Sequence, residues 1–282
     1  MGKIIDGSKI ANDIKKELSN KVKLLKKTHN VIPGLATILI GDDPGSKVYV
    51  KLKQKACQEI GIYSEKLEFP TTVNKEEIFS IIKKLNENKK IHGILVQLPL
   101  PNHLDQQEIM EKIDPEKDVD GFHPINVGKL ANRDESGFIP CTPKGILFLL
   151  EQILPSLEGK NVTIINHSTV IGRPLAMLLL NRNATVSVCH IKTDDLEKYT
   201  KKADIIITAT GVPNLIKSDM VKDGVIIIDA GFSRVEGKIV GDADFEHLKE
   251  KSSYITPPTG GVGPMTIAML LENTVLAVEK KL

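Results

Sequence analysis

The chain has 282 residues, enough for two domains, and its 41% hydrophobic and 26% charged residues are typical of a soluble globular protein with a sizeable core. Its 38 Lys and Arg residues nearly balance its 36 Asp and Glu residues, which argues against a nucleic-acid-binding or membrane protein whose binding depends on net charge. Trp is absent and other aromatic residues are few, so stacking platforms for nucleic-acid bases are not expected.

The first half of the chain predicts helices that alternate with strands. From Ser8 to His29 apolar residues recur at helical spacing, which predicts a helix whose other, lysine-rich face is solvated. The segments predicted next are a strand over 35–40, a helix over 46–60 ended by Gly61, a strand over 62–69, a helix over 74–86 with Asn74 as N-cap and Glu77 as its capping-box partner, and a strand over 93–100. Strands separated by helices indicate a parallel sheet with crossover helices.

The second half repeats this alternation after a loop-rich passage. Residues 114–143 are polar and rich in Gly and Pro, which predicts the junction between two domains. The segments predicted beyond it are helices over 142–154, 174–181 and 265–281, and strands over 162–165, 185–188, 204–209, 225–230 and 253–256. We therefore expect an α/β fold with domains at 1–121 and 122–282, the helix at 265–282 packing back on the first domain.

The three cysteines, Cys57, Cys141 and Cys189, are odd in number and far apart, and they form no C-x-x-C motif. A disulfide framework or a zinc site is therefore not expected, and a reducing compartment fits best. The first ten residues contain no signal-peptide core, and we expect no apolar run of membrane-spanning length. These features favour a cytoplasmic protein that holds no metal.

The segment from Asn161 to Leu180 predicts a buried strand, a short loop and a helix that opens at Gly172. In doubly wound folds the first turn of this kind receives the pyrophosphate of a dinucleotide on the helix N-terminus. The usual G-x-G-x-x-G pattern is absent, because Asn166 stands six residues before Gly172. The turn alone leaves open whether this is a nucleotide site or an ordinary strand–helix unit.

The end of the next predicted strand bears on the choice of cofactor. An NAD site usually carries an acidic residue there to hold the ribose hydroxyl. Here the strand runs into Cys189-His190-Ile191-Lys192, which is basic or neutral and suits the 2′-phosphate of NADP. The alternative for His190 is a surface histidine with no ligand.

Two further stretches have both a functional and an ordinary interpretation. The glycine-rich segment 256–266 is either a ligand-binding loop or a plain turn. The acidic segment 114–123 does not fit a calcium loop, because no register places glycine at position 6 and glutamate at position 12. It is either a solvated loop or the support of one buried carboxylate, Asp120, that binds the N–H donors of a ligand ring. No Ser-His-Asp elbow or H-E-x-x-H motif is present.

Five separated motifs together resemble the bifunctional methylenetetrahydrofolate dehydrogenase/cyclohydrolase family, from end to end and in the family's order. They are GDDPGSKVYVKLKQKAC, GILVQLPLP, PEKDVDGFHPINVGKL, PCTPKGI and ITPPTGGVGPMT. The resemblance implies an N-terminal α/β catalytic domain, a C-terminal Rossmann-like domain that binds NAD(P), a folate cleft between them, and a homodimer.

The resemblance also implies site residues at matching positions. Those implied to be catalytic are Tyr49, Lys53, Gln97 and Asp120, the last as the anchor of the pterin ring. The implied folate contacts add Val96, Leu98, Thr259, Gly260, Gly261, Val262 and Gly263 to these four. The implied cofactor contacts are Asn166, His167, Ser168, Ile191 and Phe232.

The chain departs from the family pattern at Asn166, His167 and Ile191, which leaves NAD open beside NADP, and at Thr259, where the family loop usually has proline. The implied function is NADP-dependent oxidation of methylenetetrahydrofolate, followed by hydrolysis of the methenyl product to 10-formyltetrahydrofolate. Lys53 would act as the base for water if burial beside a cationic substrate lowered its pKa. The alternatives are an NAD-dependent dehydrogenase without hydrolase activity and a non-catalytic nucleotide-binding protein.

Overall fold

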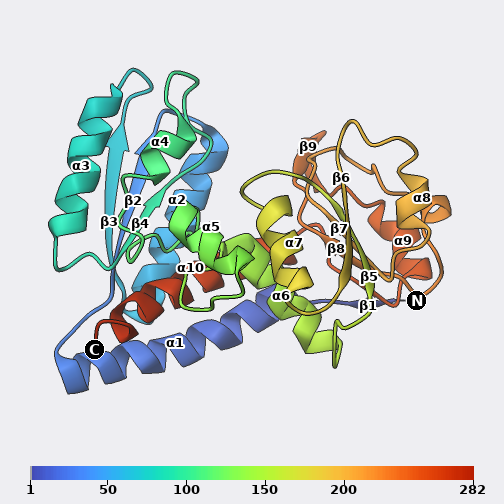
Figure 1. The fold of residues 1–282 in the computed structure, drawn as a ribbon, viewed down its shortest axis with the longest axis horizontal. Helices are drawn as coiled ribbons and strands as arrows, with labels where there is room; N and C mark the ends of the chain where they lie inside the picture. Colours follow the sequence, from blue (N-terminus) through green and yellow to red (C-terminus); the bar gives the residue numbers. More distant parts are fainter. Residues whose placement is uncertain (1) are drawn as a thin grey trace. The chain divides into compact units, whose positions relative to one another are not determined.

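The structure is a computed structural model that describes residues 2–282, so residue 1 of the first expected domain lies outside the described residues. It divides into two compact units, each built from two separated stretches of chain (Figure 1). The six-stranded unit comprises Met1–Ala11 and Thr142–Thr266, and the three-stranded unit comprises Asn12–Cys141 and Ile267–Leu282. This division differs from the expected boundary after Gly121 because residues 122–141 group with the three-stranded unit and the N-terminal strand groups with the six-stranded one.

The six-stranded unit contains a parallel sheet in the order β1-β11-β8-β7-β5-β6. Its strands are β1 (Lys3–Ile4), β5 (Asn161–Ile165), β6 (Thr185–Cys189), β7 (Ile205–Thr208), β8 (Ile226–Asp229) and β11 (Tyr254–Ile255). Around them lie α6 (Cys141–Ile153), α7 (Gly172–Leu180), α8 (Glu197–Thr200), η1 (Ser218–Met220), α9 (Phe245–Lys251) and the antiparallel pair β9 (Ser233–Val235) and β10 (Lys238–Val240). Because β6 and β7 flank β5 on opposite sides, the strand order reverses at β5, which is where doubly wound sheets bind ligands.

Isoleucine-rich strands give this sheet two apolar faces. In β7, Ile206 packs into a cluster with α9 and η1 residues, whereas its neighbours Ile205 and Ile207 point to the other face. All three are at most 1% exposed. Near-continuous apolar strands of this kind are expected where helices cover both faces of a parallel sheet.

The three-stranded unit contains a parallel sheet in the order β3-β2-β4, with α3 on one side and α2 on the other (Figure 1). Its strands are β2 (Gly34–Ile40), β3 (Tyr63–Phe69) and β4 (Gly93–Val96). Its helices are α2 (Pro44–Ile60), α3 (Lys75–Glu87), α4 (Gln106–Met110) and α5 (Pro124–Ala131). Two long helices, α1 (Gly7–His29) and α10 (Val262–Glu279), have residues in both units.

Local capping explains where the helices of the three-stranded unit begin. The Asp43 carboxylate accepts the Ser46 N–H at 2.7 Å at the start of α2, and the Asn74 side chain accepts the Glu77 N–H at 2.8 Å at the start of α3. The short helix α5 lies inside the passage expected to be loop. Pro124 occupies its first turn and the ring of His123 accepts the Ile125 N–H, so proline and histidine start a helix there.

The helix α10 is long and apolar enough to cross a membrane by length and composition, contrary to the expectation that no such run exists. However, 61% of its residues are buried inside the protein. Seven of its apolar side chains are at most 1% exposed: Met265, Ala268, Met269, Leu270, Leu271, Val275 and Ala277. We therefore interpret α10 as a core helix.

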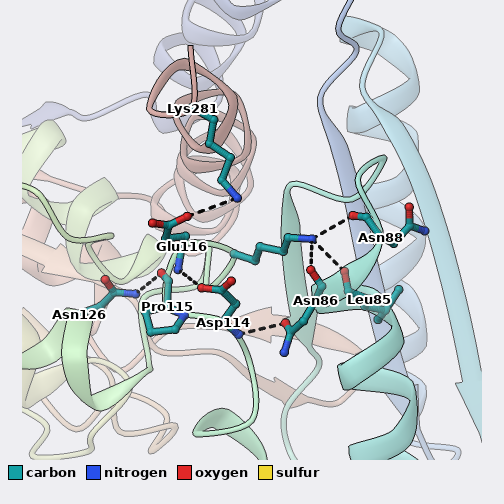
Figure 2. A network of polar contacts seen from close by, with 9 residues as sticks. Leu85, Asn86, Asn88, Asp114, Pro115, Glu116, Asn126 and Lys281 are labelled. Atoms are coloured by element: carbon teal, nitrogen blue, oxygen red, sulfur yellow. Dashed lines mark hydrogen bonds and ion pairs between the residues drawn. The ribbon is translucent and has the colours of Figure 1, made fainter.

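The acidic segment that leads to Asp120 is fixed by contacts on both sides (Figure 2). The buried Lys117 ammonium donates to three backbone oxygens at the end of α3, those of Leu85, Asn86 and Asn88, at 2.7–3.0 Å. On the other side, Glu116 pairs with Lys281 at 3.5 Å and Asn126 donates to the Pro115 carbonyl at 3.0 Å. This segment is therefore not a free solvated loop.

Candidate active site

One face of α2 carries the residues that the sequence singles out. Tyr49, Lys53 and Cys57 are spaced four apart and so share a face. Lys53 is only 8% exposed, whereas Lys51 and Lys55 on the same helix are exposed. A buried lysine needs partners, so its surroundings decide what it can do.

Gln97 is the first partner of Lys53. The Lys53 Nζ donates to Gln97 Oε1 at 2.9 Å. Gln97 directly follows β4, where its backbone N–H binds the Ile38 carbonyl at 2.9 Å and its amide Nε2 donates to the Leu98 carbonyl at 2.8 Å. Because the amide nitrogen is held in this way, the amide oxygen is oriented toward Lys53.

Asp120 is a second residue near Lys53, and its side chain is ionisable. The segment before it lies against β4, since the Ile94 N–H binds the Lys117 carbonyl at 2.8 Å. Burial raises the pKa of Asp120 above its usual value, and the nearby charge of Asp118 raises it further. The positive charge of Lys53 and a hydrogen bond from the Cys141 thiol act in the opposite direction. The three-stranded unit thus brings Lys53, Gln97 and Asp120 together.

Asp118 shapes the turn that presents Asp120. Its carboxylate accepts three backbone N–H groups, from Gly121, Phe122 and His123, and the Asn126 amide at 2.8 Å. Burial nevertheless raises the pKa of Asp118. Sequence reasoning did not single out this residue, although an aspartate two positions before a candidate anchor is a signal for a carboxylate that folds its own turn.

Cys57 is a packing residue of the same face. Its thiol is fully buried, and burial raises its pKa to about 12. A thiol of this kind is not ionised near neutral pH and is not a nucleophile. Of the remaining expected folate contacts in this unit, Val96 is buried in the core and Leu98 packs at its edge.

The glycine-rich loop at 256–263 belongs to the six-stranded unit, where it packs on the start of α1. The Ser8 N–H binds the Gly260 carbonyl at 2.8 Å, and a Cβ on Gly7 would lie 2.0 Å from the Gly261 carbonyl oxygen. Gly260 has a φ of 81°, which favours glycine. Within this loop Thr259 is exposed, Gly260 and Gly263 are half-buried, and Gly261 and Val262 are buried, so two of the five expected contacts have little exposed surface.

The turn after β5 is organised by Asn166. Its Oδ1 accepts hydrogen bonds from the Ser168 N–H, the Ser168 hydroxyl and the Gly172 N–H at 2.7–3.0 Å. Its Nδ2 donates to the Ala209 carbonyl after β7 at 2.6 Å. Asn166 therefore joins the two strand ends at the point where the strand order reverses. A Cβ on Gly172 would lie 2.0 Å from the Asn166 carbonyl oxygen, so the helix must begin with glycine here.

Basic side chains border this turn. The rings of His167 and His190 are 4.9 Å apart, and the Arg173 Nε donates to the His167 carbonyl at 3.1 Å. Ile191 is 92% exposed and Phe232 is 47% exposed, so both place apolar surface in solvent. The positive end of the α7 helix dipole, with basic groups at the end of β6, fits a phosphorylated dinucleotide.

Two buried carboxylates support the neighbouring turns. Asp229 ends β8 and accepts the Gly231 and Ala243 N–H groups, both at 2.8 Å. Burial, together with the charge of Asp242, raises the pKa of Asp229 to about 6. Asp242 accepts the Thr208 hydroxyl at 2.7 Å and is fully buried. Sequence reasoning assigned neither residue.

Comparison with known proteins identifies the family in which these two units occur together. Residues 5–120 match the model of the tetrahydrofolate dehydrogenase/cyclohydrolase catalytic domain, and residues 140–282 match that of the same family's NAD(P)-binding domain. The chain belongs to the tetrahydrofolate dehydrogenase/cyclohydrolase family.

Individual relatives agree with this family over the full length. The bifunctional protein FolD of Methanosarcina acetivorans is 53% identical over 99% of this chain and 97% of its own length. The crystal structure of the bifunctional FolD enzyme from Campylobacter jejuni is 53% identical, covers 100% of both chains and has a TM-score of 0.98. That of the Trypanosoma brucei enzyme, complexed with NADP and an inhibitor, is 37% identical, covers 99% of this chain and 98% of that one, and has a TM-score of 0.95. The expected family, the α/β two-domain fold and the NAD(P)-binding domain are confirmed.

Proposed function

We propose that this member of the family oxidises methylenetetrahydrofolate to methenyltetrahydrofolate and then hydrolyses the product to 10-formyltetrahydrofolate, with NADP as hydride acceptor. The proposal rests on one observation: Lys53 on α2 is hydrogen-bonded to Gln97 and lies close to Asp120. A buried amine held by an amide, next to a carboxylate, suits a site that binds a pterin ring and acts on water.

In the oxidation, bound NADP supplies a nicotinamide ring that accepts a hydride. The electron pair on a substrate nitrogen expels the hydride from the methylene carbon, so the chain need not supply an acid or a base. Its task is alignment, which we assign to Asp120 and Tyr49. The Asp120 carboxylate accepts N–H donors of the pterin ring, and the ring of Tyr49 positions the folate on the same helix face as Lys53.

In the hydrolysis, water adds to the methenyl carbon, the water oxygen loses a proton, and cleavage of the bond from that carbon to N5 leaves the formyl group on N10 and a proton on N5. We assign the removal of the water proton to the Lys53 amine. Gln97 keeps that amine in place through its 2.9 Å hydrogen bond, because its own amide nitrogen is bound to the Leu98 carbonyl.

The preference for NADP rests on the end of β6. No carboxylate follows this strand directly, and His190, Ile191 and Lys192 stand where an NAD site carries its acidic residue. The ring of His167 lies 4.9 Å from that of His190, which adds a second basic side chain for a 2′-phosphate. We assign Asn166, Ser168 and Phe232 to the same cofactor.

We also propose that the enzyme is a cytoplasmic homodimer, with residues 1–121 as its catalytic domain and 122–282 as its cofactor domain. Supporting a dimer, β3 is an edge strand paired only with β2, and Val48, Leu52 and Tyr63 on α2 and β3 are about half exposed. Supporting the cytoplasm, all three cysteines are buried thiols. Light scattering of the purified protein tests the dimer.

The deciding experiment is a spectrophotometric assay with methylenetetrahydrofolate and either NADP or NAD, followed by product analysis. We expect faster turnover with NADP and the formation of 10-formyltetrahydrofolate. Accumulation of the methenyl product, with NAD preferred, would instead identify a monofunctional NAD-dependent dehydrogenase. If neither cofactor is reduced in a folate-dependent way, the protein is instead a non-catalytic nucleotide-binding protein.

A further inference from the structure

We propose that Asn273, on α10, is a positioning residue for both folate reactions. Its side-chain amide holds together the two chain segments that carry Asp120 and Cys141, and so fixes the Asp120 carboxylate where it recognises the pterin ring. The inference rests on the proposed role of Asp120 as the folate anchor and adds to it a residue that the catalytic assignment does not contain.

The amide of Asn273 bridges parts of the chain that are far apart in sequence. Asn273 is fully buried. Its Nδ2 donates to the Val119 carbonyl at 2.8 Å and to the Ile139 carbonyl at 3.0 Å, and it lies 3.7 Å from the Cys141 sulfur. One side chain thus contacts both segments on which the environment of Asp120 depends.

Cys141 continues this connection to the carboxylate itself. Its thiol donates to the Val119 carbonyl at 3.3 Å, and its polar contact with Asp120 lowers the pKa of that carboxyl, which favours the charged carboxylate. Val119 directly precedes Asp120 in the chain. A shift of the Ile139–Cys141 segment therefore changes both the position of Asp120 and the polar partner that stabilises its charge.

The tight approach of the two segments has independent support at Gly121. Its φ of 76° favours glycine, and a Cβ at this position would lie 2.6 Å from the Pro140 nitrogen and 2.7 Å from the Ile139 carbonyl carbon. Glycine permits the approach but does not hold it. The donor that binds both sides is the Asn273 amide.

The buried amide is not required by α10 itself. Burying an amide costs free energy unless it is hydrogen-bonded, and asparagine is a weak helix former. The adjacent Thr274 is also fully buried, but its hydroxyl bonds the Leu270 carbonyl of its own helix at 2.8 Å. Asn273 and Thr274 are therefore a matched pair, in which Asn273 binds the segments around Asp120 and Thr274 binds only its own helix.

The test compares Asn273→Leu, which keeps the size of the side chain but removes its donors, with the control Thr274→Val. We expect Asn273→Leu to raise the KM for the folate substrate in both reactions by roughly tenfold or more, since the contacts that orient a charged group are lost. The Kd of NADP, measured without folate, should stay within about twofold, because the cofactor-binding segments are left intact. Thr274→Val should leave both constants unchanged. An unchanged folate KM in folded Asn273→Leu overturns the proposal, and so does an equal loss of NADP affinity.

A double-mutant cycle shows whether Asn273 acts through Asp120. In an Asp120→Ala background, Asn273→Leu should have little further effect on folate KM, whereas full additivity overturns the proposal. If Asp120→Ala alone leaves folate KM unchanged, the anchor role proposed above fails. If only Asn273→Leu is without effect, the positioning role alone fails. Should Asn273→Leu not fold, Asn273→Asp keeps the shape and removes at least one amide donor, and a wild-type folate KM in that variant is equally decisive against the proposal.

Discussion

Replacing Lys53 by methionine tests the chemistry most directly. Methionine keeps the length of the side chain and the helix propensity, and removes only the amine. Lys53 is 8% exposed and bonds Gln97, so the substitution leaves one part-buried amide oxygen without this donor and takes a positive charge away from Asp120. We expect a folded protein, because an apolar side chain of similar volume is well tolerated at a buried position.

The two reactions should respond differently. Hydrolysis of methenyltetrahydrofolate loses its base, and kcat should fall about a hundredfold or more, which corresponds to roughly 2.7 kcal/mol of transition-state stabilisation. The hydride step needs no base and should be affected mainly through Asp120. Without the Lys53 charge the pKa of Asp120 rises further, so a smaller fraction of the anchor is ionised and folate KM increases.

The assay pairs cofactor reduction with methenyl hydrolysis on the same purified variant, and the methenyl intermediate should accumulate. Lys51→Met is the matched control, since Lys51 lies on the same helix but is exposed, and it should behave as wild type in both assays. Hydrolysis of methenyltetrahydrofolate by Lys53→Met at the wild-type rate would refute Lys53 as the base.

Three further outcomes are expected. Asp120→Ala should raise folate KM in both reactions, because one anchor serves both, and wild-type efficiency in both assays would refute the anchor. His167→Ala should lower kcat/KM with NADP several-fold more than with NAD, and equal losses would show that the ring does not read the 2′-phosphate. The raised pKa of Asp229, about 6 against 3.8 for the ordinary side chain, means that the folded protein binds this proton more tightly than the unfolded chain. Its contribution to stability, up to roughly 3 kcal/mol, is therefore complete below about pH 4 and is lost as the pH rises through about 6. Urea unfolding should show that the wild type loses stability relative to Asp229→Asn over that pH range. If the free energy of unfolding of the two proteins changed in parallel with pH, this assignment would be wrong.

Much of the fold follows from local patterns in the sequence. Buried strands such as 35–40 and the helix ended by Gly61 are encoded by neighbouring residues, and the structure has them within a residue or two as β2 and α2. The helix α5 was missed because its eight residues lie in a passage dominated by Pro, Gly and acidic residues.

Site residues divide in the same way. Spacing brings Tyr49 and Lys53 to one face, but only the match to family motifs distinguishes Lys53 from Lys51, and the difference in burial is a property of the fold. Asp229 and Asn273 had no local signal, because Ala243, Val119 and Ile139, which they bind, lie in other segments. Asp118 had a local signal, its place two positions before the candidate anchor, but sequence reasoning did not use it. The division of the chain was equally hidden, since β1 pairs with β11, close to the other end of the sequence.

The discontinuous units have a consequence for how the protein is made. The six-stranded unit needs both its first residues and residues up to 266, and the three-stranded unit needs the helix from residue 267 onward. During synthesis, β1 emerges from the ribosome long before its pairing strand β11. The Val119 and Ile139 carbonyls likewise emerge long before Asn273, which binds them. The three-stranded unit therefore cannot be completed first, although most of its residues are made before those of the six-stranded unit. We expect the three-stranded unit to become protease-resistant only after the last helix has been released.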